Sequence, residues 1–173
     1  PLNVYGASKL AGDRMIQLAG GPYLIFRTSC VYSLKPGGFV HRVLNWARSQ
    51  ETLRVVDDQI GSPTSARMLA EISAQVIAQG RADPLGYLTE KAGLYHLAGS
   101  GLCSRYEWAQ RIMQLGSARG EIPDRQIEPV KTNEFPTPAI RPLHPVLDCS
   151  KFNRAFNLSL PNWQDALALL FAE

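Results

Sequence analysis

The chain has 173 residues, of which 45% are hydrophobic and 19% are charged. This length fits one domain or two small lobes, and the apolar content is sufficient for a buried core. The net charge of +3 comes from scattered basic residues, which gives no support to nucleic-acid binding, and the apolar runs are too short to cross a membrane.

The predicted helices and strands alternate along the chain. Apolar residues at helical spacing predict helices over 5–19, 39–50, 104–115, 150–156 and 163–172, and one more that follows a cap at Thr64. Short β-rich runs predict strands over 23–28, 53–56 and 94–98, and around Ile127. We interpret 80–93 as a surface connection and 116–147 as irregular. This alternation predicts an α/β fold with a mostly parallel sheet.

Tyr5 and Lys9 lie four residues apart in the first predicted helix, so they share one face. A nearby ammonium stabilises a phenolate, and such a phenol can exchange a proton with a carbonyl oxygen. The same spacing arises by chance, and Tyr87 and Lys91 repeat it within the predicted surface connection, where we interpret it as meaningless. The first pair differs by its small neighbours and by the strand that follows. Ligands of open α/β sheets bind beyond the carboxyl ends of strands, where residues 28–30 are expected.

The three cysteines, Cys30, Cys103 and Cys149, are far apart and form no CxxC pair. This usage predicts reduced thiols in a cytosolic protein. The three histidines show no metal-ligand spacing, and we expect no metal site among them.

Five strings occur in order along almost the whole chain: "NVYGASKLAG", "FRTSCVYS", "RVVDDQIGSPT", "GLYHLAGSG" and "PTPAIRP". Together they resemble the dTDP-4-dehydrorhamnose reductases, which are extended short-chain dehydrogenases/reductases. The resemblance implies the C-terminal portion of a Rossmann-like parallel sheet plus a small mixed α/β substrate-binding lobe. Residues 1–57 would be the remaining part of the dinucleotide-binding lobe. Residues 58–173 would be mainly the sugar-nucleotide lobe, interleaved with returning sheet elements.

The resemblance also implies a reaction. NADPH or NADH would reduce the 4-keto group of dTDP-4-dehydro-L-rhamnose, with Tyr5 as the proton donor and Lys9 as its partner and a ligand of the cofactor ribose. Thr28 and Ser29 would lie near the nicotinamide. The residues expected to bind the dTDP-sugar are Cys30, Gly38, Phe39, Gln59 and Arg141.

Three positions depart from the family pattern, and all concern the sugar. Cys30 stands where the family usually has Trp, Gly38 where Asn is common, and His144-Pro145 where Asn-Ser is usual. The Gly-rich phosphate-binding turn of the cofactor lobe is not among these residues. We therefore expect a C-terminal part of a longer protein that is inactive by itself.

The resemblance allows more than one assembly and more than one function. The family resemblance allows a homodimer, and the residues do not decide whether a divalent ion such as Mg²⁺ takes part. One alternative function is a non-catalytic, NADP-binding regulatory subunit of the same fold. Another is an epimerase or dehydratase that acts on a different sugar nucleotide.

Overall fold

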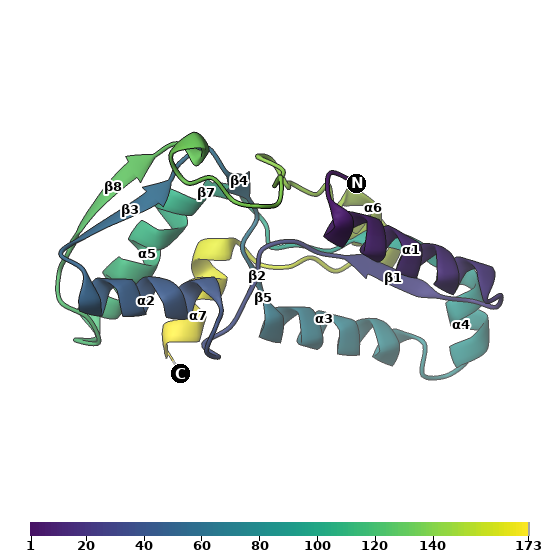
Figure 1. Ribbon diagram of the computed structural model, residues 1–173. Coiled ribbons are helices and arrows are strands. Elements are labelled where there is room, and N and C mark those ends of the chain that lie inside the picture. The colour runs from purple at the N-terminus through teal and green to yellow at the C-terminus, as the bar shows by residue number, and fades with distance from the viewer. Residues whose placement is uncertain (173) are drawn as a thin grey trace.

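The computed structural model describes residues 1–172. Helices and strands alternate through the chain, as predicted, and Figure 1 shows an elongated molecule. The helices are α1 (Val4–Leu18), α2 (Phe39–Ser49), α3 (Ala66–Gln79), α4 (Pro84–Lys91), α5 (Arg105–Ala118), α6 (Ser150–Phe156) and α7 (Trp163–Ala172), with a 3₁₀ turn η1 at Thr132–Glu134. The strands are β1 (Leu24–Arg27), β2 (Val31–Tyr32), β3 (Thr52–Val56), β4 (Ile60–Gly61), β5 (Thr64–Ser65), β6 (Gly93–His96), β7 (Cys103–Ser104) and β8 (Gln126–Val130).

The strands form four two-stranded pairs, and three of these pairs are parallel. β1 pairs with β6, β2 with β5, and β3 with β8, whereas β4 and β7 are antiparallel. The prediction of an α/β fold with mostly parallel strands is therefore confirmed. Parallel pairing requires long connections, and helices of the chain supply them.

Two buried clusters hold the molecule together, one toward each end. The first packs α2, α5 and α7 against β3, with Trp108 at its centre. The second joins α3, β6 and α6 through Phe152 and Phe156. Figure 1 shows these groups on opposite sides of the short pair β2 and β5. Each cluster takes residues from both sides of residue 57, and the division of the lobes at that position stays a prediction.

Residues 80–93 were predicted as a surface connection, and this prediction was wrong for most of the segment. The side chain of Asp83 accepts a hydrogen bond from the Gly86 N–H, and Pro84 starts α4. An Asp cap followed by Pro is a strong helix start. Tyr87 and Lys91 therefore lie on a helix, so our ground for separating them from Tyr5 and Lys9 fails. Their contacts separate them instead, because the Tyr87 hydroxyl donates to Gln79 in this peripheral region.

The cap of α3 was also predicted one residue too early. Ser65, rather than Thr64, accepts a hydrogen bond from the Met68 N–H and caps the helix. The Thr64 hydroxyl is fully buried, donates to the Ser62 carbonyl and accepts from the Gly99 N–H. Thr64 thus joins the central strands to the loop after β6.

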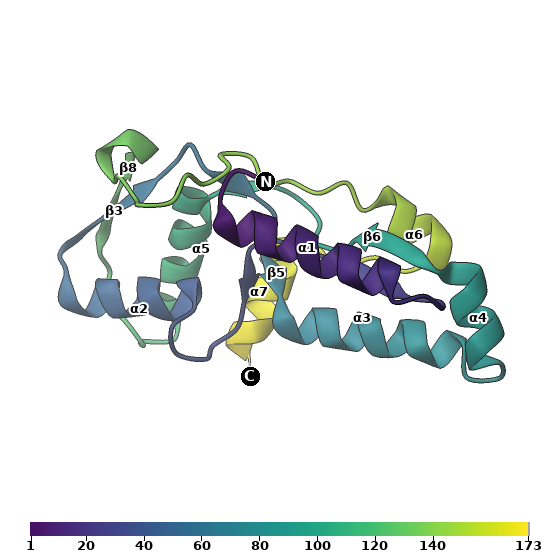
Figure 2. The same ribbon diagram turned by 45° about the vertical axis from the view of Figure 1, so that its right-hand side comes forward.

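Helix α1 lies along the edge of the molecule, and two contacts fix its position. Asp13 forms an ion pair of 2.7 Å with Arg27 at the end of β1. Asn3 donates from its side chain to the Ile140 carbonyl, at 2.7 Å. Figure 2 shows α1 crossing the front of the molecule above α3. Within residues 1–172, no helix combines the length and the apolar character that crossing a membrane requires.

Candidate functional site

The first turn of α1 presents Tyr5 and Lys9 on one face. The Asn3 side chain caps the helix by accepting a hydrogen bond of 2.9 Å from the Gly6 N–H, so the helix begins at the next residue, Val4. The Lys9 ammonium lies 5.5 Å from the centroid of the Tyr5 ring. Tyr5 is 70% exposed, so its ring is available to a ligand. The predicted pair is therefore formed, with its phenol directed at open space rather than at the core.

One cavity of about 610 Å³ lies between α1 and the end of β1, and Tyr5, Lys9 and Thr28 all line it. Thr28 follows directly after β1, at the carboxyl end of a parallel strand, as predicted. The Lys9 ammonium has no hydrogen bond or ion pair with any residue that the structure describes. This cavity thus offers three free ammonium donors next to a phenol.

A second cavity, of about 450 Å³, also has Tyr5 in its wall, together with Ser29 and Cys30. The Ser29 hydroxyl is buried and finds no partner among residues 1–172. Cys30 has a left-handed backbone, with φ of 49°, and its carbonyl accepts a hydrogen bond from the Thr64 N–H. Burial raises the pKa of the Cys30 thiol, and the neighbouring Arg105 opposes this shift. The thiol is therefore neutral at physiological pH.

A third cavity, of about 520 Å³, lies along α2 and β3 and contains aromatic and cationic side chains. Phe39 and Trp46 form an edge-to-face pair on one side, and Arg54 lies over Phe135 on the other. Aromatic faces of this kind can stack on a flat ring.

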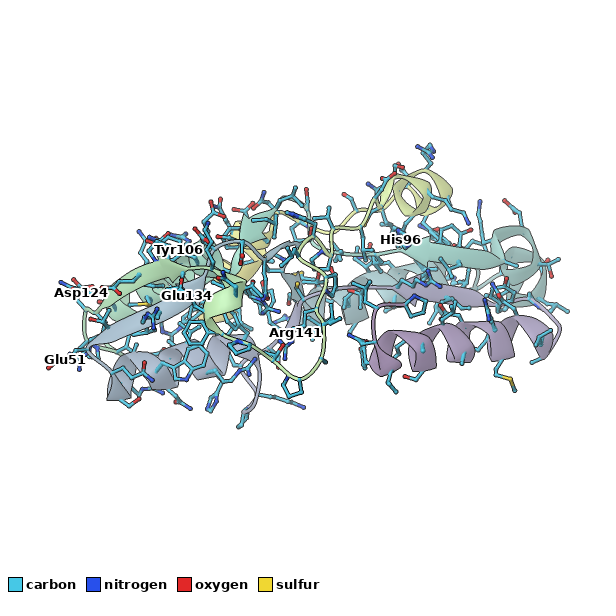
Figure 3. The ribbon with its side chains drawn as sticks, turned by 45° about the horizontal axis from the view of Figure 1, so that its top comes forward. Glu51, His96, Tyr106, Asp124, Glu134 and Arg141 are labelled. Atoms are coloured by element: carbon cyan, nitrogen blue, oxygen red, sulfur yellow. The ribbon has the colours of Figure 1, made fainter. Side chains whose placement is uncertain are left out.

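Gln59, Arg105 and Arg141 line both the second and the third cavity, so they mark the boundary between them. The Gln59 amide donates to the Thr132 hydroxyl at 3.1 Å, which fixes its orientation from a distant part of the chain. Arg141 lies on the long loop between η1 and α6, and Figure 3 shows it between the two halves of the molecule. A polar and cationic boundary thus separates a cavity that contains Tyr5 from one with aromatic walls.

The structure brings together most of the residues predicted for the site. Phe39, Cys30, Gln59 and Arg141 line the second or third cavity, and Thr28 and Ser29 lie on either side of Tyr5. Gly38 lines neither of these cavities; it is the N-cap of α2 and contributes no side-chain cap. Pro145, one of the family departures, is part of the second cavity.

Arg105 and Trp108 were missed by the sequence prediction. Both lie at the start of α5, where Ser104 and Glu107 form a capping box. Trp108 is buried, yet it lines the second cavity. For Arg105, the only available signal was its place beside the cap. The part of the chain that the structure describes holds no cluster of three or more His, Cys, Asp or Glu side chains suited to a metal ion.

The fold is therefore α/β, and its helix-borne Tyr–Lys pair lies near the carboxyl end of the parallel strand β1, with Tyr5 in the walls of two cavities. The family model of the RmlD substrate binding domain matches residues 1–173. The chain belongs to this family.

The curated relatives support the same assignment. The dTDP-4-dehydrorhamnose reductase of Escherichia coli K12 is 39% identical over 165 residues, which cover 95% of this chain and 54% of the relative. The enzyme of the same name from Salmonella typhimurium is 37% identical over 174 residues, which cover 100% of this chain and 56% of the relative. The chain thus spans about half the length of the curated relatives it matches.

Solved structures show the same fold. A dTDP-4-dehydrorhamnose reductase from Bacillus anthracis, in complex with NADP, matches with a TM-score of 0.84 and 30% identity, covering 99% of this chain and 55% of that chain. A UDP-glucuronic acid 4-epimerase from Bacillus cereus matches with a TM-score of 0.73 at 16% identity, covering 99% of this chain and 52% of that chain, and shows the fold alone. The resemblance inferred from the five sequence strings is confirmed.

Proposed function

We propose that this chain is the proton-donating and substrate-binding part of an NADPH-dependent reductase that converts dTDP-4-dehydro-L-rhamnose to dTDP-L-rhamnose. The observation that carries the proposal is that Tyr5 lines two cavities at once. One contains Lys9 and Thr28 and suits a cofactor; the other leads to the cationic boundary and suits a sugar nucleotide. The names of the relatives support this choice of substrate.

Tyr5 acts as the general acid in this proposal. NADPH, when bound, supplies the hydride that adds to C4 of the sugar, and the keto oxygen takes the proton of the Tyr5 hydroxyl. The product is therefore a secondary alcohol, and the tyrosinate is reprotonated from solvent. Lys9 stabilises the tyrosinate, because its ammonium lies beside the ring.

The residues around the first cavity fit a dinucleotide cofactor. Lys9 has unpaired donors for ribose hydroxyls, and Thr28 lines the same cavity just after β1. Ser29 lines the second cavity, and its buried hydroxyl has no hydrogen-bond partner among residues 1–172. The NADP complex of the Bacillus anthracis relative supports NADPH as the cofactor, with NADH as the alternative. The exposure of Tyr5 and Lys9 means that these residues form only one wall of the cofactor site. For this reason we propose that residues 1–173 alone do not turn over NADPH.

The substrate extends from the second cavity into the third. The sugar lies beside Tyr5 and Cys30, the diphosphate meets Arg141 at the boundary, and the thymine ring enters the aromatic cavity of Phe39. Gln59 contacts the sugar nucleotide with its free carbonyl oxygen, because its amide nitrogen is bonded to Thr132. Gly38 contributes backbone contacts only.

Steady-state NADPH oxidation by the full-length protein tests this function. We expect oxidation with dTDP-4-dehydro-L-rhamnose and no 4-epimerisation of UDP-sugars, since the fold is shared with a 4-epimerase and does not separate the two activities. Epimerisation without net NADPH oxidation would establish the epimerase alternative. NADPH binding without activity on any sugar nucleotide would establish the regulatory subunit. The same assay on residues 1–173 tests the predicted inactivity of this part, while the homodimer, the divalent ion and the cytosolic location stay predictions.

A further inference from the structure

Arg105 places its guanidinium over two aromatic rings. It is the first residue of α5, directly after the Ser104 cap. Its guanidinium carbon lies 4.8 Å from the centroid of Phe39 and 5.5 Å from that of Trp108. A guanidinium is weakly hydrated and interacts favourably with aromatic faces, so these contacts restrain the position of the charge while its N–H groups make no hydrogen bond within residues 1–172.

The Arg105 guanidinium has no anionic partner among residues 1–172. Among residues 1–172, no hydrogen bond or ion pair involves the Arg105 side chain, although its backbone N–H donates to the Gln59 carbonyl. Arg54, which lines the same third cavity, is by contrast paired with Glu134. A half-buried guanidinium without an anion is costly, because burial removes water that would otherwise solvate the charge.

Two more unpaired arginines lie near Arg105. Burial lowers the pKa of Arg105, and the positive charges of Arg141 and Arg42 lower it further. Neither Arg141 nor Arg42 has an ion pair with a described residue. Three guanidiniums thus converge on one region without a carboxylate to balance them, and an anionic ligand would relieve their repulsion.

The position of Arg105 indicates which part of a ligand it meets. It lies at the boundary of the second and third cavities, as Arg141 does. A nucleoside diphosphate sugar has its sugar at one end, its base at the other and its two phosphates between them. A sugar beside Tyr5 and a base beside Phe39 would place those phosphates at this boundary.

We propose that Arg105 binds the diphosphate of the substrate together with Arg141, and that it selects a nucleoside diphosphate over a monophosphate. This inference rests on the proposed function. The planar fork of a guanidinium matches two phosphate oxygens, and the contacts with Phe39 and Trp108 hold the guanidinium in place before the ligand arrives. Arg105 is therefore a specificity-determining residue, separate from the proton donor.

Calorimetric titration of the full-length protein with dTDP, dTMP and thymidine tests the inference. Arg105→Gln should weaken dTDP binding by about tenfold to a hundredfold, the range for a hydrogen bond to a charged group. It should weaken dTMP binding less and leave thymidine binding unchanged. Arg105→Lys, which keeps the charge but loses the fork, should fall between. Arg81→Gln, an equal change of charge at an exposed position after α3, is the matched control and should have no effect.

An equal loss of dTDP and thymidine affinity in Arg105→Gln would overturn the inference, because it would show that Arg105 only packs. Unchanged dTDP affinity would overturn it as well, even if the variant reduced sugar turnover, since Arg105 would then contact the sugar. If Arg105→Gln does not fold, the same comparison of dTDP with thymidine in Arg105→Lys decides. Failure of the proposed function looks different: dTDP binding would depend on Arg105, but NADPH would not be oxidised with the keto sugar.

Discussion

Replacing Gly99 by Ala should destabilise the protein strongly, because two backbone segments cross there. A Cβ on Gly99 would lie 2.2 Å from the Pro63 carbonyl oxygen and 3.3 Å from its carbonyl carbon. Ordinary contacts between non-bonded heavy atoms are about 3.5–4.0 Å, so the segments must separate by more than about 1 Å. Pro63 is fully buried, and side-chain rotation cannot relieve a backbone clash.

The expected loss of stability in Gly99→Ala has two contributions. Overpacking costs about 1–3 kcal/mol, and separating the segments stretches the 3.0 Å hydrogen bond from the Gly99 N–H to the Thr64 hydroxyl, worth about 1 kcal/mol. A total of about 3 kcal/mol lowers Tm by about 6–12 °C in a chain of this size. Thermal unfolding followed by far-UV circular dichroism measures the shift.

The control is Gly12→Ala in the middle of α1. A Cβ there meets no atom within 4 Å, so alanine should raise stability by about 0.5–1 kcal/mol through helix propensity. A Gly99→Ala variant with the Tm of the wild type, alongside a stabilised Gly12→Ala, would refute the reasoning about the crossing.

Two further predictions concern contacts next to the site. Gly61→Ala would place a Cβ 2.8 Å from the Cys30 sulfur and should lower the free energy of unfolding in urea by about 1–3 kcal/mol. The same change in a Cys30→Ala background should lower it much less, and equal losses in both backgrounds would contradict the contact. Hydrogen bonds from Thr132 lower the pKa of Asp58 below its ordinary 3.8. These bonds therefore stabilise the folded protein above pH 3.8, and the stabilisation disappears as the pH falls through the lower pKa that Asp58 has in the folded state. Thr132→Val should therefore reduce the free energy of unfolding by less than about 1 kcal/mol near neutral pH, and the difference from wild type should shrink in acid; a difference that grows in acid would show that the carboxylate is not the cause.

Local patterns predicted the long elements well, because helices α1, α2 and α5 and strands β1 and β3 carry clear periodicity or caps. The two-residue strands were not predictable, since a pair such as β4 and β7 is too short to show alternation and exists only through its distant partner. Helix α4 was missed for a different reason. Its polar composition hid a start signal, Asp83-Pro84, that was present in the sequence.

The candidate site likewise contains contacts that are local in the sequence and contacts that only the fold creates. Tyr5 and Lys9 are neighbours on one helix turn, so their proximity follows from spacing alone. The contact of Gln59 with Thr132 and the contact of Arg105 with Phe39 join residues far apart in sequence, and only the fold creates them. Neither contact leaves a local pattern that sequence analysis can detect.

In the proposed mechanism, Tyr5 donates its hydroxyl proton to the keto oxygen of the sugar. The most direct measurement is the single-turnover rate of NADPH oxidation by full-length Tyr5→Phe at saturating dTDP-4-dehydro-L-rhamnose, with Tyr87→Phe as the matched control. We expect Tyr5→Phe to oxidise NADPH about a hundredfold or more slowly than the wild type, with unchanged binding of dTDP and NADPH, and Tyr87→Phe to keep the wild-type rate. A wild-type rate in Tyr5→Phe would contradict this mechanism.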